Sequence, residues 1–428
     1  MSVVLQSNSG WVLDSQSLID RGYARCITWT GHHKSHVKCN FKRQCFDILK
    51  SHYDMSGRVD GGHTVMTQKT EKCAKVDCLS CRLYLSECKQ KCVEACSWVD
   101  IRSIILEGTK SLVDSAQSLG YLSGETETSK GPLPSQDCRL AALCEMAKEL
   151  PLVADEEQEW TQSLLTEEGV ASHVDLFSQV TENSEAWAAV VPLMGEEYII
   201  PHDTAFLLSD FTRIQPLVQC ECNEKKKRKR SGRRFDVIVI DPPWENKSVK
   251  RSRRYSSLPS SQLKRLPVPL LGSPGCLVVT WVTNRPSHLR FVRDELYPHW
   301  GVEVVAEWFW VKVTTSGEFV FPLDSPHKKP YEVLVLGRPL QTANVPVEDK
   351  RLIVSVPSAL HSQKPSLSEV LKLYVGAEAK CLELFARSLQ PGWTSWGNEV
   401  LKFQHISYFD LEPADTSKAE ATEDAAET

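Results

Sequence analysis

The chain has 428 residues, which is too many for one ordinary hydrophobic core, so two or three domains are expected. Its formal net charge is only −5, but basic residues cluster between Glu224 and Arg265 and acidic residues between Asp155 and Glu185, so an anionic partner is not excluded. The chain shows neither a signal peptide nor a membrane span, and its 15 cysteines indicate reduced thiols or metal ligands rather than a disulfide framework. A soluble intracellular protein without a membrane partner is expected.

Residues 1–96 are rich in cysteine and histidine and show no sustained hydrophobic period, so their fold stays open. Cys78 and Cys81 have the two-residue gap that lets two sulfurs face one zinc ion. The cysteines at positions 88, 92 and 96 instead recur at helical spacing within a charged stretch. Reduced cysteines along an amphipathic helix are therefore favoured over a structural zinc, and no metal ligand is predicted.

Residues 97–194 are predicted to form a helical regulatory or docking region. Apolar residues approximate a helical stripe over 97–119, and a polar linker follows near 123–131. Residues 140–152 and 160–165 resemble two further helices. The N-terminal part of the chain is thus expected to be mostly helical and rich in cysteine.

Residues 195–411 alternate strand and helix patterns, which predicts an α/β doubly wound sheet. The expected strands are 198–201, 205–208, 237–240, 276–282, 302–313, 331–337, 352–356 and 380–385, and the expected helices are 285–296 and 366–374. Residues 412–428 are dominated by Ala, Glu, Asp and Thr and are expected to form a disordered acidic tail.

The most informative stretch is the apolar run 237–240, which leads directly into Asp241-Pro242-Pro243-Trp244. Four β-branched residues in a row are typical of a strand buried on both faces. The two prolines end that strand because neither can donate to a neighbouring strand. An acid and an indole are therefore expected at the carboxyl edge of the sheet, where open α/β folds bind ligands.

This tetrapeptide suits chemistry on an exocyclic adenine amine, whose lone pair is delocalised into the ring. The Asp241 carboxylate and the Pro242 carbonyl, which is expected to be free of strand pairing, can both accept from the amine and turn its lone pair outward. Trp244 offers a face on which a purine can stack, and a methyl sulfonium is the matching electrophile. The alternative is a rigid strand-end turn with a surface carboxylate and a core tryptophan.

Two basic segments flank the central strand. Residues 225–230 consist only of Lys and Arg and predict an exposed loop that is a nuclear import signal, a nucleic-acid tether or only solvated. The second segment follows the tetrapeptide at the carboxyl edge of the sheet, where its cations would bind phosphates and its aromatic ring would stack on a base. The alternative is a solvated loop. The members of the second segment are Lys247, Lys250, Arg251, Arg253, Arg254 and Tyr255.

The tetrapeptide and several downstream blocks resemble the DPPW-type, MT-A70-like adenine N6-methyltransferases. The matching blocks are residues 246–252, 280–285, 302–308, 316–336 and 382–404. The resemblance implies a Rossmann-like methyltransferase domain that uses S-adenosylmethionine, with the tetrapeptide preceding part of the cofactor site in chain order.

The resemblance also implies a set of cofactor residues. By motif, Asp210 and Phe211 would meet the cofactor adenine, and Lys364 would approach the methionine carboxylate. Ribose and adenine would be held by Glu383, Arg387, Asn398 and Glu399. Each residue alone could be a surface ion pair or a loop cap, so the joint match is what supports the assignment.

Residues near the target base follow from the same resemblance: Tyr255, Trp281, Trp310 and Glu332. The two tryptophans could equally be core residues of their strands. The chain departs from the family pattern at Ser388-Leu389, where the mRNA N6-adenosine methyltransferase of the family has a His-Asn pair, so ribose contacts at these positions stay unassigned. Residues 225–230 resemble an insertion and receive no catalytic role.

The implied activity is N6-methylation of adenine in nucleic acid. Agreement is best with one branch of the family, which implies 2′-O-methyladenosine of a spliceosomal small nuclear RNA, U2, as the substrate, with an influence on splicing. That branch also implies a location in the nucleus, with the cytoplasm as a second location, and activity without an obligate catalytic partner. DNA adenine is the alternative substrate, and a silent nucleic-acid-binding subunit is the alternative class.

Overall fold

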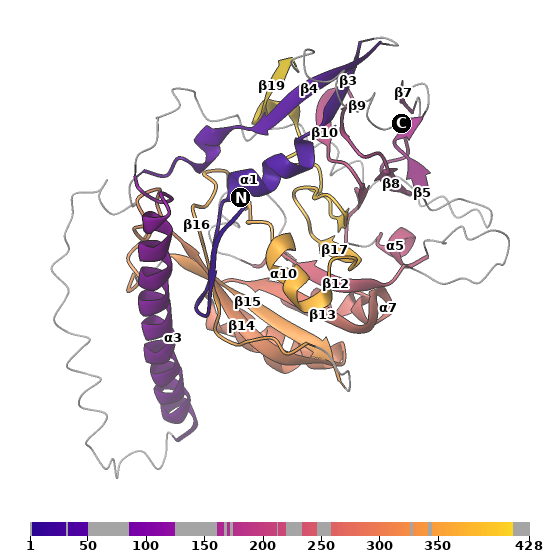
Figure 1. Cartoon of the computed structure of the whole chain (residues 1–428). Coiled ribbons are helices and arrows are strands. Elements are labelled where there is room, and N and C mark those ends of the chain that lie inside the picture. The colour runs from indigo at the N-terminus through magenta and orange to yellow at the C-terminus, as the bar shows by residue number, and fades with distance from the viewer. Residues whose placement is uncertain are drawn as a thin grey trace.

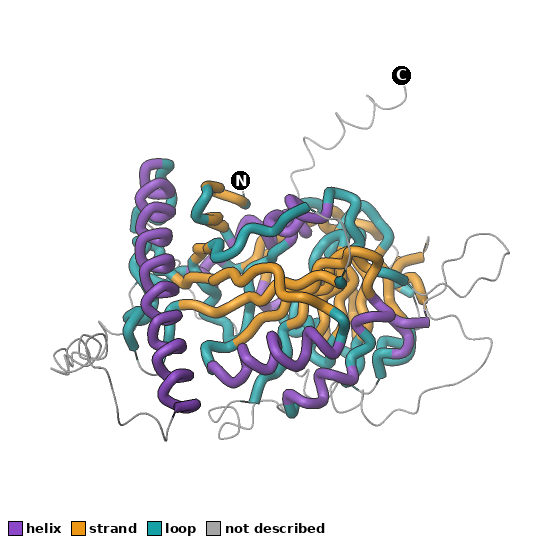
Figure 2. The backbone as a smooth tube through the Cα atoms, turned by 90° about the horizontal axis from the view of Figure 1, so that it is seen from below, coloured by secondary structure: helices purple, strands orange, loops and turns teal. Residues whose placement is uncertain are grey.

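Two sheets and one long helix organise the described part of the chain. The computed structural model describes residues 2–30, 33–49, 85–124, 161–166, 169–171, 174–211, 213–219, 233–245, 258–325, 328–340 and 345–413, with the backbone alone for 85–99. In Figure 1 the long helix α3 (Leu85–Ser118) stands along one side of a broad sheet, and a smaller sheet lies above that sheet. Figure 2 shows short helices lying along one side of the strands.

The larger sheet has twelve strands within the described residues, in the order β1-β2-β16-β14-β15-β13-β12-β17-β18-β11-β8-β5. In that order they span Val3–Ser7, Gly10–Leu13, Leu352–Ser355, Val302–Lys312, Tyr331–Pro339, Gly272–Val282, Phe235–Ile240, Cys381–Leu384, Trp393–Trp396, Thr204–Leu207, Val180–Asn183 and Thr161–Ser163. The predicted α/β architecture is confirmed as a large mixed sheet.

Strand direction decides where the site lies. β13, β12, β17, β18 and β11 are parallel neighbours. β14, β16 and β2 run the same way, because β13 and β14 are both antiparallel to β15 and β16 is parallel to β14 and β2. The carboxyl ends of all these strands therefore meet at one edge, the expected ligand edge of an α/β sheet.

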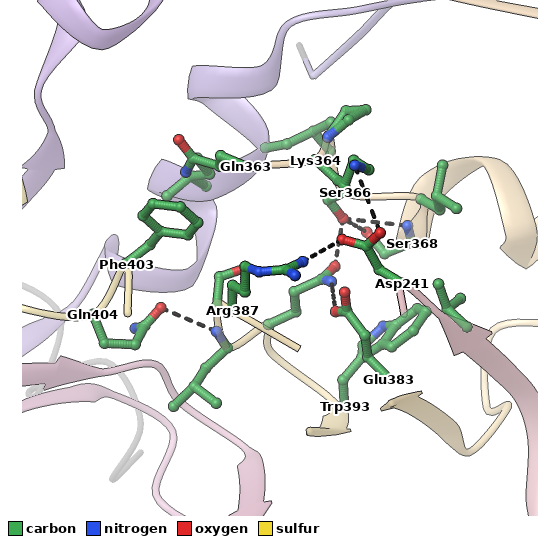
Figure 3. A pocket seen from close by; sticks show the side chains of 18 of the residues that line it. Asp241, Gln363, Lys364, Ser366, Ser368, Glu383, Arg387, Trp393, Phe403 and Gln404 are labelled. Atoms are coloured by element: carbon green, nitrogen blue, oxygen red, sulfur yellow. Dashed lines mark hydrogen bonds and ion pairs between the residues drawn. The ribbon is translucent and has the colours of Figure 1, made fainter. Parts of the chain in front are cut away.

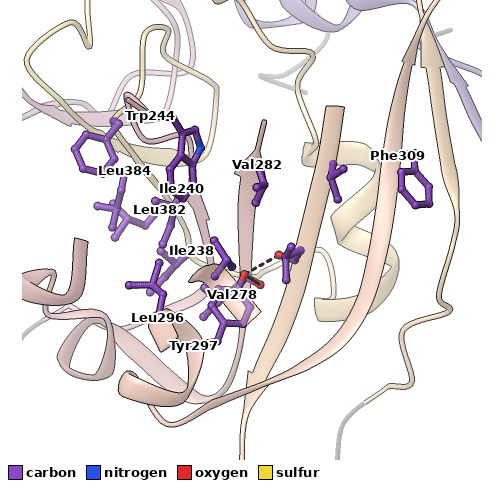
Figure 4. Close-up of a cluster of buried hydrophobic side chains, with 14 of the residues drawn as sticks. Ile238, Ile240, Trp244, Val278, Val282, Leu296, Tyr297, Phe309, Leu382 and Leu384 are labelled. Carbon is purple, nitrogen blue, oxygen red and sulfur yellow. Dashed lines mark hydrogen bonds between the residues drawn. The ribbon is translucent and has the colours of Figure 1, made fainter. Parts of the chain in front are cut away.

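The central strand β12 is buried on both faces, as its β-branched run predicts. Ile238 and Ile240 belong to the apolar cluster shown in Figure 4, while Val237 and Val239 belong to the cluster on the opposite face. Alternate residues of a strand point to opposite faces, so a strand covered on both sides must be apolar throughout.

Helices cover the sheet where the sequence has helical periodicity. The stripe over 97–119 is confirmed by α3, whose Ile105, Leu112 and Ala116 are buried against β1, β2, β14 and β16. The predicted helix 285–296 is found as α8 (Pro286–Arg290), a π-helical turn (Phe291–Leu296) and α9 (Tyr297–His299). The remaining α-helices of the described residues are α1 (Ser15–Asp20), α5 (Gln215–Gln219), α7 (Val268–Leu271) and α10 (Ser368–Val375). None of the helices described is both long and apolar enough to cross a membrane.

The prediction of a mostly helical N-terminal region is wrong. Five strands, in the order β10-β9-β3-β4-β19, form the smaller sheet and span Glu196–Ile200, Ala188–Leu193, Cys26–Thr30, His33–Phe41 and Phe409–Pro413. The predicted helix 160–165 is replaced by β5 and by β6 (Leu165–Thr166), which pairs with β7 (Gly169–Val170). Some of these strands form local hairpins, such as β3–β4 and β9–β10, but the small sheet is assembled by pairing β3 with β9 and β4 with β19, and such distant pairing leaves little local periodicity.

Several predictions fall outside the described residues. They concern the helix at 140–152, the cysteines at 73, 78 and 81, the basic loop 225–230 and the tail beyond Pro413. The domain boundaries also remain a prediction.

Candidate active site

Asp241 occupies the first position after β12, at the carboxyl edge of the parallel strands. Its backbone N–H donates to the Leu384 carbonyl at 3.1 Å, which extends the β12–β17 pairing by one residue before the prolines end it. The residue is only 6% exposed. A carboxylate held at this depth requires charged or hydrogen-bonding partners.

Two cations supply those partners. Arg387 Nη1 lies 2.5 Å from Asp241 Oδ2, and Lys364 Nζ lies 3.6 Å from Asp241 Oδ1 (Figure 3). Arg387 follows β17, and Lys364 lies in the segment between β16 and α10. Together with Trp281 and Glu383 these residues line one pocket.

The pairing continues on both sides into an alternating row of cations and carboxylates, which we call the ion chain. Its successive contacts are Lys312 Nζ to Glu332 Oε1 (2.6 Å), Glu332 Oε2 to Lys364 Nζ (3.0 Å), Lys364 to Asp241, Asp241 to Arg387, Arg387 Nε to Glu399 Oε2 (3.1 Å) and Glu399 Oε1 to Lys402 Nζ (2.9 Å). The members come from the ends of β14, β12, β17 and β18, from β15 and from the segment after β16.

The ion chain sets the protonation of its members. Burial raises the pKa of Glu332, but Lys364 and Lys312 outweigh burial and bring that pKa to about 2. Burial lowers the pKa of Lys364, yet Asp241 and Glu332 more than compensate and raise it above its ordinary value. For Glu399 the lowering by Lys402 and Arg387 exceeds the effect of burial, so its pKa is also lowered. These groups are therefore charged at neutral pH.

Glu383 behaves differently from the carboxylates of the ion chain. Burial, followed by the nearby charge of Asp241, raises its pKa to about 7, although a hydrogen bond from Gln390 Nε2 at 3.0 Å opposes the shift. Ser366 Oγ in turn donates to Gln390 Oε1 at 2.5 Å. A carboxyl group poised near neutrality thus lies beside Asp241, and its charge changes within the physiological range.

The Trp244 side chain is fixed rather than free. Its Nε1–H donates to the Trp281 carbonyl at 2.8 Å, and its ring stacks on His288 with centroids 4.7 Å apart. Only 6% of Trp244 is exposed, so a purine would meet little of the ring in this conformation. The Pro242 carbonyl is outside the strand pairings of the described residues, as predicted, but it accepts a local hydrogen bond from the Trp244 N–H at 2.8 Å, which leaves its second lone pair.

Comparison with known proteins identifies this arrangement. Residues 235–399 match the MT-A70 family. The chain is 53% identical over 324 residues to the mouse "N(6)-adenine-specific methyltransferase METTL4", across 72% of this chain and 66% of the mouse protein. The chain belongs to the MT-A70 family.

Other relatives carry names with different substrates. The "N6-methyladenosine RNA methyltransferase MTA1" of Pyricularia oryzae is 39% identical over 188 residues, across 41% of this chain and 50% of the fungal protein. The "DNA N6-methyl methyltransferase" of Caenorhabditis elegans is 33% identical over 216 residues, across 50% of this chain and 56% of the worm protein. The chain also spans only about two thirds of the length of its METTL4 relatives, 66% in mouse and in human.

The structure brings most of the cofactor residues implied by the MT-A70 resemblance to one edge. Lys364, Glu383 and Arg387 line the pocket, and Glu399 contacts Arg387. Asp210 and Phe211 follow β11, and Phe211 stacks on Phe385 with centroids 6.3 Å apart. Asn398 lies two residues after β18, which is parallel to β11 and β17.

Of the residues implied for the target base, three are described. Trp281 and Trp310 are each 2% exposed and pack edge to face with centroids 5.6 Å apart, so both are core residues. They are also close to the ion chain, since Lys364 Nζ lies 5.5 Å from the Trp281 ring and Lys312 Nζ 4.4 Å from the Trp310 ring. The residues Lys247, Lys250, Arg251, Arg254 and Tyr255 lie outside the described residues.

Sequence reasoning missed several residues of this site. Leu18 and Ile19 of α1 and Phe41 of β4 line the pocket, although they precede Asp241 by about 200 residues. Gln390, Lys312 and His288 were also missed. Of these three only Lys312 gave a signal: it is the last residue of β14, and charges at the ends of buried strands often face a site.

The donor set fits the cofactor that the MT-A70 family implies. A methionine carboxylate needs buried cations, which Lys364 and Arg387 provide, and a sulfonium or ammonium needs carboxylates, which Asp241 and Glu383 provide. The described residues contain no cluster of three or more His, Cys, Asp or Glu side chains arranged to hold a metal ion.

Proposed function

We propose that the chain is an S-adenosylmethionine-dependent N6-adenine methyltransferase acting on RNA, with 2′-O-methyladenosine of U2 small nuclear RNA as its target. The observation that carries the activity is the buried Asp241 carboxylate at the strand edge, held between Lys364 and Arg387. The choice of RNA rests on the resemblance to one branch of the family. We also propose a nuclear location, on the basis of the basic run 225–230, with the cytoplasm as a second location, and activity without an obligate catalytic partner.

The two Asp241 oxygens are not equivalent in this mechanism. Oδ2 is hydrogen bonded to Arg387, whereas Oδ1 has Lys364 at 3.6 Å, beyond ordinary hydrogen-bond distance. Oδ1 is therefore the oxygen that accepts an N–H of the target amine and directs its lone pair outward. The second lone pair of the Pro242 carbonyl supplies the other acceptor.

The remaining steps depend on position more than on proton transfer. S-adenosylmethionine, when bound, supplies the methyl group as a sulfonium. Asp241 need not remove a proton before transfer, because the amine becomes strongly acidic only after it is methylated. The protein groups hold donor and acceptor in line, which can contribute several kcal/mol of the barrier reduction, about 7 or more in well-oriented systems.

The test compares three acceptors. Purified protein is incubated with radiolabelled methyl donor and matched oligonucleotides of RNA, RNA with 2′-O-methyladenosine, and DNA. Label is expected in RNA, most of all in the 2′-O-methylated form, and Asp241→Ala is expected to abolish transfer while RNA binding survives. Label in DNA alone would reject the proposed substrate, and unchanged turnover in Asp241→Ala would reject the mechanism.

DNA adenine remains the second candidate substrate, because the worm relative carries a DNA methyltransferase name. A silent subunit that only binds nucleic acid is less well supported, since Asp241 and Trp244 are both present. Absence of label in all three acceptors would favour the silent subunit.

A further inference from the structure

One strongly basic surface lies outside the candidate active site. Residues 21–46 contain no Asp or Glu but six basic residues: Arg21, Arg25, Lys34, Lys38, Lys42 and Arg43. The whole chain has a net charge of −5, so the charge of this stretch is opposite in sign to that of the chain. It includes β3 (Cys26–Thr30) and β4 (His33–Phe41), an antiparallel pair that we call the β3–β4 ribbon.

Three of the six basic residues have a role in the fold. Arg21 pairs with Glu369 at 3.5 Å, Arg43 with Asp47 at 3.9 Å, and Lys42 donates to the Ser407 carbonyl at 2.8 Å. Arg21 and Arg43 are nonetheless exposed, and so are Arg25, Lys34 and Lys38, which form no ion pair within the described residues. Lys34 and Lys38 belong to the β3–β4 ribbon itself.

The cations of β4 lie on one face. Lys34, His36 and Lys38 alternate along the strand, so their side chains point the same way at intervals of about 7 Å. Glu412 of β19 lies opposite Lys38, but within the described residues the two form no ion pair. Asp410 of β19 lies opposite Asn40 on the same face, so both β19 carboxylates stand toward the Phe41 end of β4, and the positive charge is concentrated toward Lys34, where an extended polyanion can contact it.

Aromatic rings accompany these charges. The Lys34 Nζ lies 4.0 Å from the centroid of the Trp187 ring, and Trp29 of β3 is the cross-strand partner of Lys34. Both tryptophans are partly exposed. Cations interleaved with aromatic rings are typical of surfaces that bind single-stranded nucleic acid.

The β3–β4 ribbon is connected directly to the pocket. Phe41, the last residue of β4, lines the pocket beside Asp241, and its backbone is held by Asp20 and Gln16 at 2.7 and 3.0 Å. From Phe41 to Lys34 the strand extends about 24 Å, and its residues change from buried to exposed along that length. In Figure 1, β3 and β4 extend away from the body of the molecule beside β19.

We propose that the β3–β4 ribbon binds the phosphate backbone of the nucleic acid that flanks the target adenosine, with Lys34 and Lys38 as phosphate-contacting residues. This inference rests on the proposed function, because it requires a nucleic acid whose adenine enters the pocket. The β3–β4 ribbon contributes affinity and not sequence discrimination, since phosphate contacts carry no base information.

The salt dependence of binding tests this proposal. The full chain and the variant Lys34→Ala/Lys38→Ala are titrated into a short fluorescein-labelled single-stranded RNA over about 50 to 200 mM salt. Each lost phosphate contact reduces the slope of log affinity against log salt by about 0.7. The double variant should therefore be less steep by about 1.4, so its affinity should fall about sevenfold less than wild type across that range.

Lys110→Glu on the exposed face of α3 is the matched control, because it changes the net charge by the same two units. It should keep the wild-type slope, and retained S-adenosylhomocysteine binding would show that both variants are folded. An unchanged slope in the double variant, or an equal change in the control, would overturn the proposal. Absence of methyl transfer by the wild type would reject the proposed function instead, and the slope would still report on the β3–β4 ribbon.

Discussion

The ion chain and the β3–β4 ribbon are both rich in charged residues, but in the part of the chain that the structure describes these residues are paired with one another in the ion chain and unpaired in the β3–β4 ribbon. In the ion chain, cations and carboxylates alternate and each contacts its neighbours. In the β3–β4 ribbon, Lys34 and Lys38 are exposed and face no carboxylate in an ion pair within the described residues. Burial explains the difference, because a buried charge needs a counter-charge whereas an exposed one is stabilised by water.

The comparison also separates two functions of charge. Buried, paired charges hold a reacting group at a fixed position, and their loss affects stability and chemistry together. Exposed, unpaired charges attract a polyanion, and their loss affects affinity and its salt dependence. Substitutions in the two regions should therefore differ in size and in kind.

Asp241→Asn should have the largest effect. It leaves Arg387 and Lys364 with less counter-charge in a buried site, so the free energy of unfolding should fall by about 3–5 kcal/mol. Methyl transfer should fall by at least about 100-fold, because the amide is a weaker acceptor for the target amine. Urea denaturation and radiolabel transfer measure the two effects.

Glu295→Gln serves as the comparison for that change. Glu295 pairs with Lys264 at 2.9 Å, but its side chain is 57% exposed, so the loss should be at most about 1 kcal/mol. Equal denaturation midpoints for the two variants would contradict the distinction between buried and exposed charges.

Glu383→Gln should have the next largest effect, and its sign should depend on pH. The folded-state pKa of Glu383 is raised from 4.5 to about 7, so the native state holds a proton that the unfolded state has lost between these values. Wild-type stability should therefore fall by about 3 kcal/mol from this group as pH rises from about 4.5 to 7. Glu383→Gln removes that decline and should gain stability relative to wild type near pH 8.

Urea denaturation of both proteins near pH 5 and pH 8 measures the effect of Glu383. The difference in free energy of unfolding between variant and wild type should be larger near pH 8. A difference that is the same at both pH values would show that this carboxyl group titrates normally.

Lys34→Ala should have the smallest effect on stability. Its side chain is exposed and its only described partner is the Trp187 ring, so the free energy of unfolding should change by at most about 0.5 to 1 kcal/mol. Thermal or urea denaturation checks this expectation. A loss comparable to that of Asp241→Asn would mean that the β3–β4 ribbon is structural.

The strands and helices around Asp241 were predictable because the sequence patterns that indicate them lie within each element. The run 237–240 is apolar at every position, and the helix beginning at Pro286 has its start signal next to its own periodicity. The tetrapeptide after β12 placed Asp241 correctly, since prolines end a strand wherever it pairs. The resemblance to a known family then supplied residues such as Lys364 and Arg387, which the structure brings into contact with Asp241.

Much of the fold and site that was not predicted depends on contacts between residues far apart in the sequence. Leu18 and Phe41 reach the pocket because β2 joins the large sheet and β4 the small one, and neither pairing leaves a periodic pattern. The predicted helix 160–165 was wrong because residues 161–163 pair with β8 as β5, and Leu165 begins β6, which pairs with β7. The Trp244–His288 stack likewise joins residues whose separation in sequence gives no signal.

The pairing of β2 with β16 has a consequence for how the protein is made. Gly10 and Leu352 are register partners, so β2 leaves the ribosome long before its partner does. Contacts between residues so far apart in sequence slow folding, because the intervening chain must first be ordered. During synthesis one edge of β2 therefore lacks its strand partner until β16 is made, although β1 already pairs with the other edge, and that open edge is a place where a chaperone would act.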